Sequence, residues 1–434
     1  MSQILLRRRR VLSAVALTVA AAIALSACSS AETSTSGGDQ VTLTMWTWSN
    51  EAKKALEGGI LDSFTKNHPN ITVEVLAQPD DSYQTLLTTG LAGSNGPDLA
   101  AVRSYGVISS FADSGNLVAL DDVVSDWSGF SDIALQGVTS RSDGKIYAVP
   151  QGIQTAQIYY NKKIFSDLGI SVPKTWAEFL DTAKTIKDSG TAPIVIPGAV
   201  AGQIALAGEV LGNARRGGNA FTKKFVAGEV DLTADDNVES IALMKDIEPY
   251  LVDNVTSVTL DEAVTLFATG RAAMFPSGTW QVATFANMGA TVDYGTFDLP
   301  VGADWPSPEV TVSYADGGWA LAKRSPHQEQ AKELLNWLAS TDYFQQYANA
   351  MGTIPPRGGV TIADPQISAM YERYLQSAST YLGIAYLRYG TPWGTDLFGE
   401  QVQKIWLGQQ DAPGAAAEMQ KGIDAWFDPA DFAQ

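Results

Sequence analysis

Eleven tryptophans are the residues of this 434-residue sequence whose chemistry is most distinctive. An indole ring offers a flat apolar face that can stack on the CH face of a sugar, provided that hydrogen-bonding groups lie beside it. The tryptophans that fit such a surface lie at strand ends or among Gly, Pro and Ser: Trp46, Trp48, Trp280, Trp319 and Trp393. Those at helical spacing with other apolar residues are predicted to lie in the core: Trp176, Trp337, Trp406 and Trp426. Trp127 and Trp305 fall in predicted loops and are not assigned.

Signatures of catalysis are scarce in the sequence. It has no G-x-S-x-G, H-E-x-x-H or P-loop motif, and Gly144-Lys145 is followed by Ile146 rather than by Ser or Thr. Its two histidines, His68 and His327, leave little for histidine-based catalysis or metal binding. We therefore predict a binding protein that is not an enzyme and that uses no cofactor and no metal. A secreted glycoside hydrolase stays the enzymatic alternative, because 47 acidic residues offer many carboxylate pairs in space.

The charge balance argues against a nucleic-acid partner. The 29 Lys and Arg residues against 47 Asp and Glu give a net charge of −18, and such a surface repels phosphate backbones. Hydrophobic residues make up 45% of the chain, which is enough for most of it to bury a core. The single cysteine excludes an intrachain disulfide.

The first forty residues have the pattern of an export signal. Arg7 to Arg10 precede the apolar run Val11 to Leu25, which is shorter than the roughly 20 residues of a spanning helix. The run ends in Leu25-Ser26-Ala27-Cys28, which resembles the lipobox of bacterial lipoproteins. This resemblance implies a signal peptide over 1–27, a lipidated Cys28 and a flexible tether over 28–40. It places the protein at the extracellular face of the cell membrane. A free or buried Cys28 is the alternative, and export by the general or the twin-arginine route stays open.

The elements that must position the tryptophans alternate between strands and helices. Apolar residues alternate over 41–45 and 71–75, which predicts half-buried strands, and 97–102 reads as a buried strand. Between them, apolar spacing predicts helices over 52–64 and 83–91. This β-α-β-α-β order favours an α/β fold with a largely parallel sheet.

The chain continues with further strands and becomes mostly helical beyond Thr341. Strands are predicted over 146–149, 157–160 and 194–196. Two capping boxes, Thr175 to Glu178 and Ser325 to Gln328, predict helix starts.

Taken in order, the motifs resemble the sugar-binding proteins of ABC importers, the family typified by maltose-binding protein. The stretches that carry the resemblance are 43–46, 96–99, 143–150, 159–162, 173–176, 270–280, 317–320 and 354–357. The resemblance covers essentially all of 41–430. It implies two α/β lobes of the periplasmic-binding-protein type, joined by hinge strands, with the ligand in the cleft between them. By this analogy one lobe holds 41–149 plus 295–340, and the other holds 150–294 plus 341–434.

Candidate ligand-binding residues in the N-terminal third follow predicted strands. Trp48, Asn50 and Glu51 lie in the first strand-to-helix loop, where ligands of open α/β sheets are commonly bound. A helix N-cap is the alternative role of Asn50, and a dipole-favoured acid that of Glu51. Asp98 matches the Pro-Asp step at which the family often binds sugar hydroxyls, with turn capping as its alternative. Tyr105 follows the same strand and is expected to line the cleft.

The remaining candidates lie further along the chain. Trp280 occupies the position where the maltose-binding family carries a ligand-stacking Trp. Gly318 and Trp319 form a second candidate, because a glycine lets backbone amides approach a ligand, but a tight turn before a strand explains them equally well. Arg357 matches a position where the family often places an Arg, with a surface salt bridge as the alternative. Trp393 is a further candidate, and the resemblance places Gln151 at the hinge crossing, where it is the last one.

These observations predict a monomeric, lipid-anchored receptor that binds a carbohydrate, most simply an oligosaccharide, and delivers it to the permease subunits of an ABC transporter. An amino acid, a polyamine or a phosphorylated polyol is the alternative ligand. A phosphate would call for clustered basic residues, and the dense pairs of the mature chain, Arg215-Arg216 and Lys223-Lys224, are expected on a solvated face.

Overall fold

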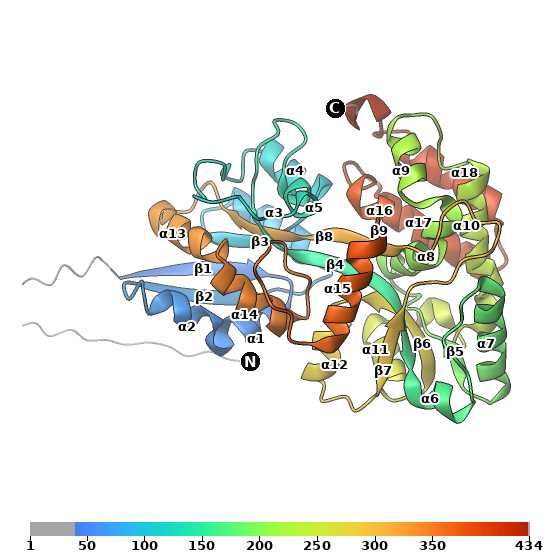
Figure 1. Ribbon diagram of the computed structural model, residues 1–434. Helices are drawn as coiled ribbons and strands as arrows, with labels where there is room; N and C mark the ends of the chain where they lie inside the picture. Colours follow the sequence, from blue (N-terminus) through green and yellow to red (C-terminus); the bar gives the residue numbers. More distant parts are fainter. Residues whose placement is uncertain (1–39, 433–434) are drawn as a thin grey trace, which may run out of the picture. The chain divides into compact units, whose positions relative to one another are not determined.

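The computed structural model describes residues 40–432 (Figure 1). The predicted signal peptide, Cys28 and most of the tether lie outside the described residues. None of the helices within 40–432 combines the length and the apolar character needed to cross a bilayer.

A single mixed sheet runs through the described residues and confirms the predicted α/β class. Its strands are β1 (Val41–Thr47), β2 (Ile71–Ala77), β3 (Leu99–Arg103), β4 (Val149–Asn161), β5 (Ala192–Ile194), β6 (Ala272–Gly278), β7 (Tyr294–Phe297), β8 (Thr311–Leu321) and β9 (Ala378–Thr380). Their order is β2-β1-β3-β8-β4-β6-β5, with β7 paired to β4 and β9 paired to β8. The predicted β-α-β-α-β unit is parallel, since β1 pairs in parallel with both β2 and β3. Antiparallel β8 and β4 then join this unit to β6 and β5.

The long strand β4 replaces two strands that were predicted separately over 146–149 and 157–160. It pairs with β8 over most of its length, with irregular register around Pro150 and Gly152. Nearly all its residues are buried, including Gln154 and Gln157. Polar residues buried between neighbouring strands break the alternation of apolar side chains, so periodicity alone split this strand in two.

A first group of helices packs around β1, β2 and β3. They are α1 (Asn50–Ala55), η1 (Leu56–Ile60), α2 (Leu61–Thr65), α3 (Tyr83–Ala92), α4 (Gly106–Asp113), α5 (Asp132–Val138), α13 (Gln328–Leu338) and α14 (Thr341–Met351). The helix predicted over 52–64 is interrupted by the π-helical turn η1, within which Gly59 has a φ of 129°. Its predicted apolar face is still buried along its whole length. We call the apolar side chains beneath these helices the first core.

A second group of helices packs around β4, β5, β6 and β9 and encloses the second core. The group comprises α6 (Lys162–Asp167), α7 (Trp176–Asp188), α8 (Ala201–Arg216), α9 (Gly218–Val226), α10 (Asp235–Asp246), α11 (Leu260–Ala268), α12 (Gln281–Asn287), α15 (Pro365–Ser377), α16 (Leu382–Ala385), α17 (Gly394–Trp406), α18 (Ala412–Ile423) and the short 3-10 turns η2 (Glu248–Tyr250), η3 (Val255–Ser257) and η4 (Pro429–Phe432). The capping box at Thr175 is confirmed, because its Oγ1 accepts from Glu178 N at 3.2 Å. The box at Ser325 is not formed: α13 has His327 as N-cap, and the Ser325 hydroxyl donates to Asp98 instead.

Helix α14 and strand β7 each pack against a different core from the one expected from the lobe to which the family resemblance assigned them. Helix α14 was placed with the second lobe, but Tyr343 and Phe344 are buried in the first core. Strand β7 was placed with the first lobe, but it pairs with β4, and Phe297 is buried in the second core. The apolar faces of these elements decide the core that they join, and the lobe limits stay a prediction.

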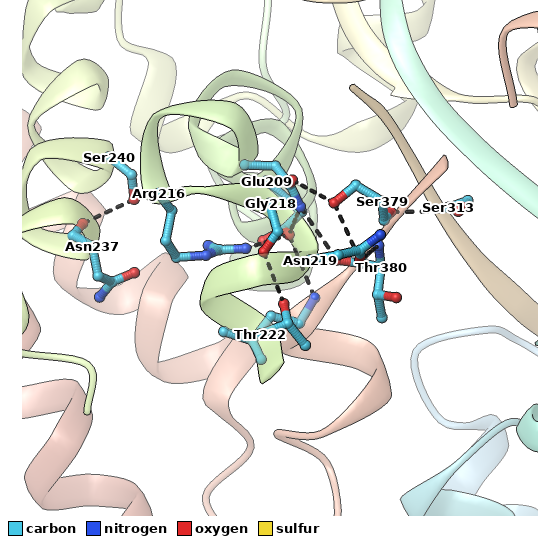
Figure 2. A network of polar contacts seen from close by, with 12 residues as sticks. Glu209, Arg216, Gly218, Asn219, Thr222, Asn237, Ser240, Ser313, Ser379 and Thr380 are labelled. Carbon is cyan, nitrogen blue, oxygen red and sulfur yellow. Dashed lines mark hydrogen bonds and ion pairs between the residues drawn. The ribbon is translucent and has the colours of Figure 1, made fainter. Parts of the chain in front are cut away.

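A buried polar network ties α8 to β9 (Figure 2). Glu209 and Arg216, each about 5% exposed, form an ion pair at 2.5 Å. Glu209 also accepts from Asn213 Nδ2 at 2.6 Å, and Asn213 Oδ1 in turn accepts from the Ser379 hydroxyl at 2.8 Å. Asn219 donates to Ala378 O at 3.0 Å. These bonds fix the short strand β9, which has little apolar surface of its own, against α8.

Candidate functional site

Trp319 and Gly318 lie inside the sheet rather than on a ligand-facing surface. Trp319 has no exposed surface, and its Nε1 donates to the hydroxyl of Tyr343 at 2.9 Å. Gly318 lies in the middle strand β8, opposite Val102 on β3 and Pro150 on β4. Strand pairing and core packing account for both residues, which corrects the prediction that they contact ligand.

Tyr105 is also buried, and its side chain is part of the second core. It is 2% exposed, and its hydroxyl accepts from Ala315 N at 3.1 Å. Its φ of 58° and ψ of −121° are unusual for a residue other than glycine. The neighbouring Ser104 donates to Ala315 O at 2.5 Å, so both residues anchor the end of β3 to β8. The structure therefore gives Tyr105 a role in joining the strands.

Asp98 is a hub of structural hydrogen bonds. It is 4% exposed, and its Oδ2 accepts from Thr44 N at 2.8 Å. Its Oδ1 accepts from the Ser325 hydroxyl at 2.6 Å and lies 3.2 Å from Nδ1 of His327. Both carboxylate oxygens are thus occupied within the protein, which corrects the predicted ligand contact to a capping role.

The Asp98→Ala variant is expected to lower the free energy of unfolding by roughly 2–4 kcal/mol, because it leaves buried donors of Thr44 and Ser325 without an acceptor. Asp98→Asn keeps one acceptor oxygen and is expected to cost less. Denaturant unfolding of both variants measures the difference, and equal loss from the two variants would contradict the hub role.

Arg357 binds the protein itself. Its guanidinium donates to the carbonyls of Ala339 and Ser128 and pairs with Asp126 at 3.1 Å. It also lies 4.9 Å from the ring centroid of Phe130. These contacts fix residues 126–130 to the end of α13, so the alternative prediction, a salt bridge, is the one that the structure supports.

The loop after β1 keeps its predicted residues near the surface. Ser49, rather than Asn50, is the N-cap of α1, and its hydroxyl donates to Glu51 at 3.1 Å. Asn50 is exposed and Trp48 is half-buried. The Trp48 ring is edge-on to Tyr83 at 5.5 Å, and the guanidinium of Arg103 lies 4.6 Å from its centroid. An aromatic face with a carboxylate, an amide and a guanidinium beside it is suited to bind a polyhydroxylated ligand.

Trp280 lies at the start of α12 and faces partly outward. Its ring folds back over Gly278, where an added Cβ would stand 1.8 Å from Cζ3 of the indole, so only glycine permits this placement. Helix α12, which Trp280 precedes, contacts α1, which Trp48 precedes. Two segments more than 200 residues apart in the sequence, each with a half-buried tryptophan before its helix, therefore contact each other.

Trp393 is paired with Arg388, which was not among the site residues predicted from the sequence. The guanidinium of Arg388 lies 5.0 Å from the ring centroid of Trp393, which is half-buried and packs against the same part of the first core as Trp48. Burial lowers the pKa of Arg388. No local motif marks Arg388, whereas Arg103 directly follows the strand predicted over 97–102 and could have been found from that position.

A chain of polar side chains links β4, β8 and the loop before Trp280. Gln154 Nε2 donates to Asp316 at 3.0 Å, and the hydroxyl of Thr279 donates to Gln154 Oε1. Burial raises the pKa of Asp316, although the bond from Gln154 and the charge of Arg103 act in the opposite direction. Nearby on β4, Gln151 is 4% exposed and its Nε2 has no partner within the described residues. Sequence periodicity missed this chain because its members are spread over distant segments.

The predicted site residues therefore fall into two sets. The residues that the structure uses for packing or capping are Asp98, Tyr105, Gly318, Trp319 and Arg357. The residues that remain partly exposed are Trp48, Asn50, Glu51, Trp280 and Trp393. Within residues 40–432 no group of three or more His, Cys, Asp and Glu side chains is arranged to hold a metal ion.

Comparison with known proteins agrees with this architecture. The chain is 30% identical over 331 residues to the maltodextrin-binding protein MdxE of Bacillus subtilis, which is 74% of each chain. It is 29% identical over 327 residues to the diacetylchitobiose binding protein DasA of Streptomyces coelicolor, covering 72% of this chain and 73% of that protein. The fold matches a solved chitin oligosaccharide binding protein with a TM-score of 0.77 and 23% identity, over 89% of this chain and 99% of the other. Residues 47–343 match the family of bacterial extracellular solute-binding proteins, and the chain therefore belongs to this family of binding proteins.

Proposed function

We propose that this protein binds a carbohydrate outside the cell and delivers it to the permease of an ABC transporter. The observation that carries the proposal is the contact between α1 and α12, the two helices that follow the half-buried Trp48 and Trp280 in the chain. Asn50 and Glu51 beside Trp48 supply the polar groups that sugar hydroxyls need. The names of the relatives, which bind maltodextrin and diacetylchitobiose, support the same ligand class.

The mechanism that we propose is closure of two lobes around the ligand. Strands β4 and β8 pass between the first and the second core, so bending in them would change the separation of α1 and α12. A ligand that contacts both tryptophans stabilises the closed form by its differential affinity, and the permease recognises that form. Lipidation of Cys28 would hold the monomeric receptor at the extracellular face of the membrane, with 28–40 as tether.

Replacing Trp280 by alanine is expected to weaken sugar binding by about 1–3 kcal/mol, because the stacked indole face is lost. Titration calorimetry against the best-bound oligosaccharide measures the effect. Trp337→Ala is the matched control: this half-buried tryptophan lies on α13 and should leave the affinity unchanged. If both variants bind as tightly as the parent protein, Trp280 has no place in the site.

The glycoside hydrolase alternative is separated from the proposal by the fate of the bound sugar. A receptor returns its ligand unchanged after long incubation, whereas a hydrolase releases shorter products that chromatography detects. Binding of an amino acid, a polyamine or a polyol phosphate in place of any sugar would instead favour the non-sugar alternative.

A further inference from the structure

Arg388 is a half-buried arginine that has no carboxylate partner among the described residues. Its Nε donates to the hydroxyl of Thr395 at 3.2 Å, and Trp393 covers one side of its guanidinium at 5.0 Å. Within residues 40–432 no Asp or Glu oxygen comes within 4.0 Å of it. Asp396 is close enough for its charge to act on Arg388, but it does not form an ion pair.

The other arginines of the described chain show how unusual it is for a half-buried arginine to have no carboxylate partner. Arg271 and Arg324 are exposed. Each remaining buried or half-buried arginine within residues 40–432 has a carboxylate within 4.0 Å: Arg103 with Asp80, Arg141 with Asp431, Arg215 with Asp236, Arg216 with Glu209, Arg357 with Asp126 and Arg373 with Asp298. Arg388 is the exception in this set. Because a guanidinium removed from water is normally paired, the position of Arg388 calls for an anion from outside the chain.

A second guanidinium lies on the facing segment. The backbone of Arg388 lies directly against Gly106, where an added Cβ would be 2.2 Å from Arg388 O, and Gly106 follows Arg103 by only three residues. The charges of Arg388 and Arg103 both act on Tyr314, whose pKa is raised by burial. Arg103 lies over Trp48 as Arg388 lies over Trp393, so each half of the arrangement is an indole with a guanidinium beside it.

The charge of Arg103 is already shared, because Asp80 pairs with it. The charge of Arg103 also acts on Asp316, which accepts from Gln154 Nε2. Arg388 is therefore the group whose positive charge is left for a ligand, and Arg103 is placed to assist it. A guanidinium binds a carboxylate through two parallel hydrogen bonds, and it does so most strongly where water is partly excluded.

We propose that Arg388, assisted by Arg103, binds the carboxylate of an acidic sugar, so that the ligand is a uronate-containing oligosaccharide. This inference rests on the proposed carbohydrate-binding function and narrows it to an acidic class. Sugar rings would stack on the indoles of Trp48 and Trp393, while a C6 carboxylate in place of the C6 hydroxymethyl group would reach Arg388.

Calorimetry with matched pairs of oligosaccharides tests the proposal. The pairs are oligomers of glucuronate, galacturonate and mannuronate against equally long oligomers of glucose, galactose and mannose. At least one uronate oligomer is expected to bind about tenfold or more tightly than its neutral counterpart at low salt, and this preference should shrink as salt is added.

The variant Arg388→Gln should abolish this preference, because it should weaken the binding of uronate oligomers more than the binding of neutral oligomers. Arg388→Lys keeps the positive charge and should retain part of the preference for uronate oligomers. Arg271→Gln, an exposed arginine, is the matched control and should behave as the parent protein. Circular dichroism and thermal unfolding of each variant establish that the fold is intact.

The possible results distinguish failure of the uronate proposal from failure of the proposed carbohydrate-binding function. If a neutral sugar binds and no uronate is preferred, or if sulfated or phosphorylated sugars bind in place of uronates, the uronate assignment is overturned and the proposed carbohydrate-binding function stands. If Arg388→Gln keeps the full preference for uronate, Arg388 is not the group that binds the carboxylate. If no sugar of either kind binds while another solute does, the proposed function itself fails.

Discussion

Arg216→Met is expected to lower the free energy of unfolding by about 3–5 kcal/mol, because it leaves the buried carboxylate of Glu209 without its cation. Glu209 is 5% exposed, and its Oε1 would retain only the bonds from Asn213 and the amide of Leu382. Since Asn213 also bonds Ser379 and Thr380, the loss should reach β9. Denaturant unfolding followed by circular dichroism measures the change.

The paired variant Glu209→Gln/Arg216→Met controls for this result, since removing both charges is expected to cost less than removing the cation alone. Arg271→Met changes an exposed arginine in the same way and should stay within about 0.5 kcal/mol of the parent protein. If Arg216→Met alone were as stable as the parent protein, the ion pair between Glu209 and Arg216 would not be needed to hold α8 and β9 together.

Trp319→Ala is expected to cost about 3–5 kcal/mol of stability, as large-to-small changes of fully buried aromatic residues do. The indole is 0% exposed at the crossing of β3, β8 and β4, and its removal also leaves the buried hydroxyl of Tyr343 without a donor. Trp319→Phe should cost less, because most of the cavity stays filled.

Trp48→Ala gives the contrast that makes this prediction specific. Because Trp48 is half-buried, Trp48→Ala is expected to lower ligand affinity more than the free energy of unfolding. For Trp319→Ala we expect the opposite, a large loss of stability. Thermal unfolding and calorimetry on the same preparations compare the two. Equal stability of Trp319→Ala and the parent protein would contradict the packing role and reopen Trp319 as a ligand residue.

Much of the fold could be predicted because its elements carry regular apolar patterns. The alternation in 41–45 and 71–75 marked β1 and β2, and the four-residue spacing from Ala52 to Phe64 marked a buried face despite the π-helical turn inside it. Prediction failed for β4, whose buried glutamines break the pattern, and for the start of α13, where Ser325 turns toward a partner far away in sequence.

The candidate site divides along a similar line. Residue type and local context predicted that Trp48 and Trp280 lie outside the helix packing surfaces, and the structure leaves both indoles half-buried, while their contact with a ligand stays a prediction. Context was misleading for Asp98 and Trp319, since hydrogen bonds to Ser325 and Tyr343 depend on residues that only folding brings near.

Arg388 could not be found from sequence at all. Its neighbours along the chain are ordinary, and what sets it apart is the lack of a carboxylate that the other half-buried arginines of the described chain possess. A missing partner is a property of three-dimensional surroundings. The juxtaposition with Arg103 likewise depends on the close approach at Gly106.

The central claim is that this chain is a carbohydrate receptor, and titration calorimetry against a panel of neutral and acidic oligosaccharides tests it most directly. We predict saturable binding of at least one oligosaccharide, recovery of that sugar unchanged, and weaker binding by Trp280→Ala. Binding of an amino acid, polyamine or polyol phosphate with no response to any sugar, or conversion of the bound sugar to products, would contradict the claim.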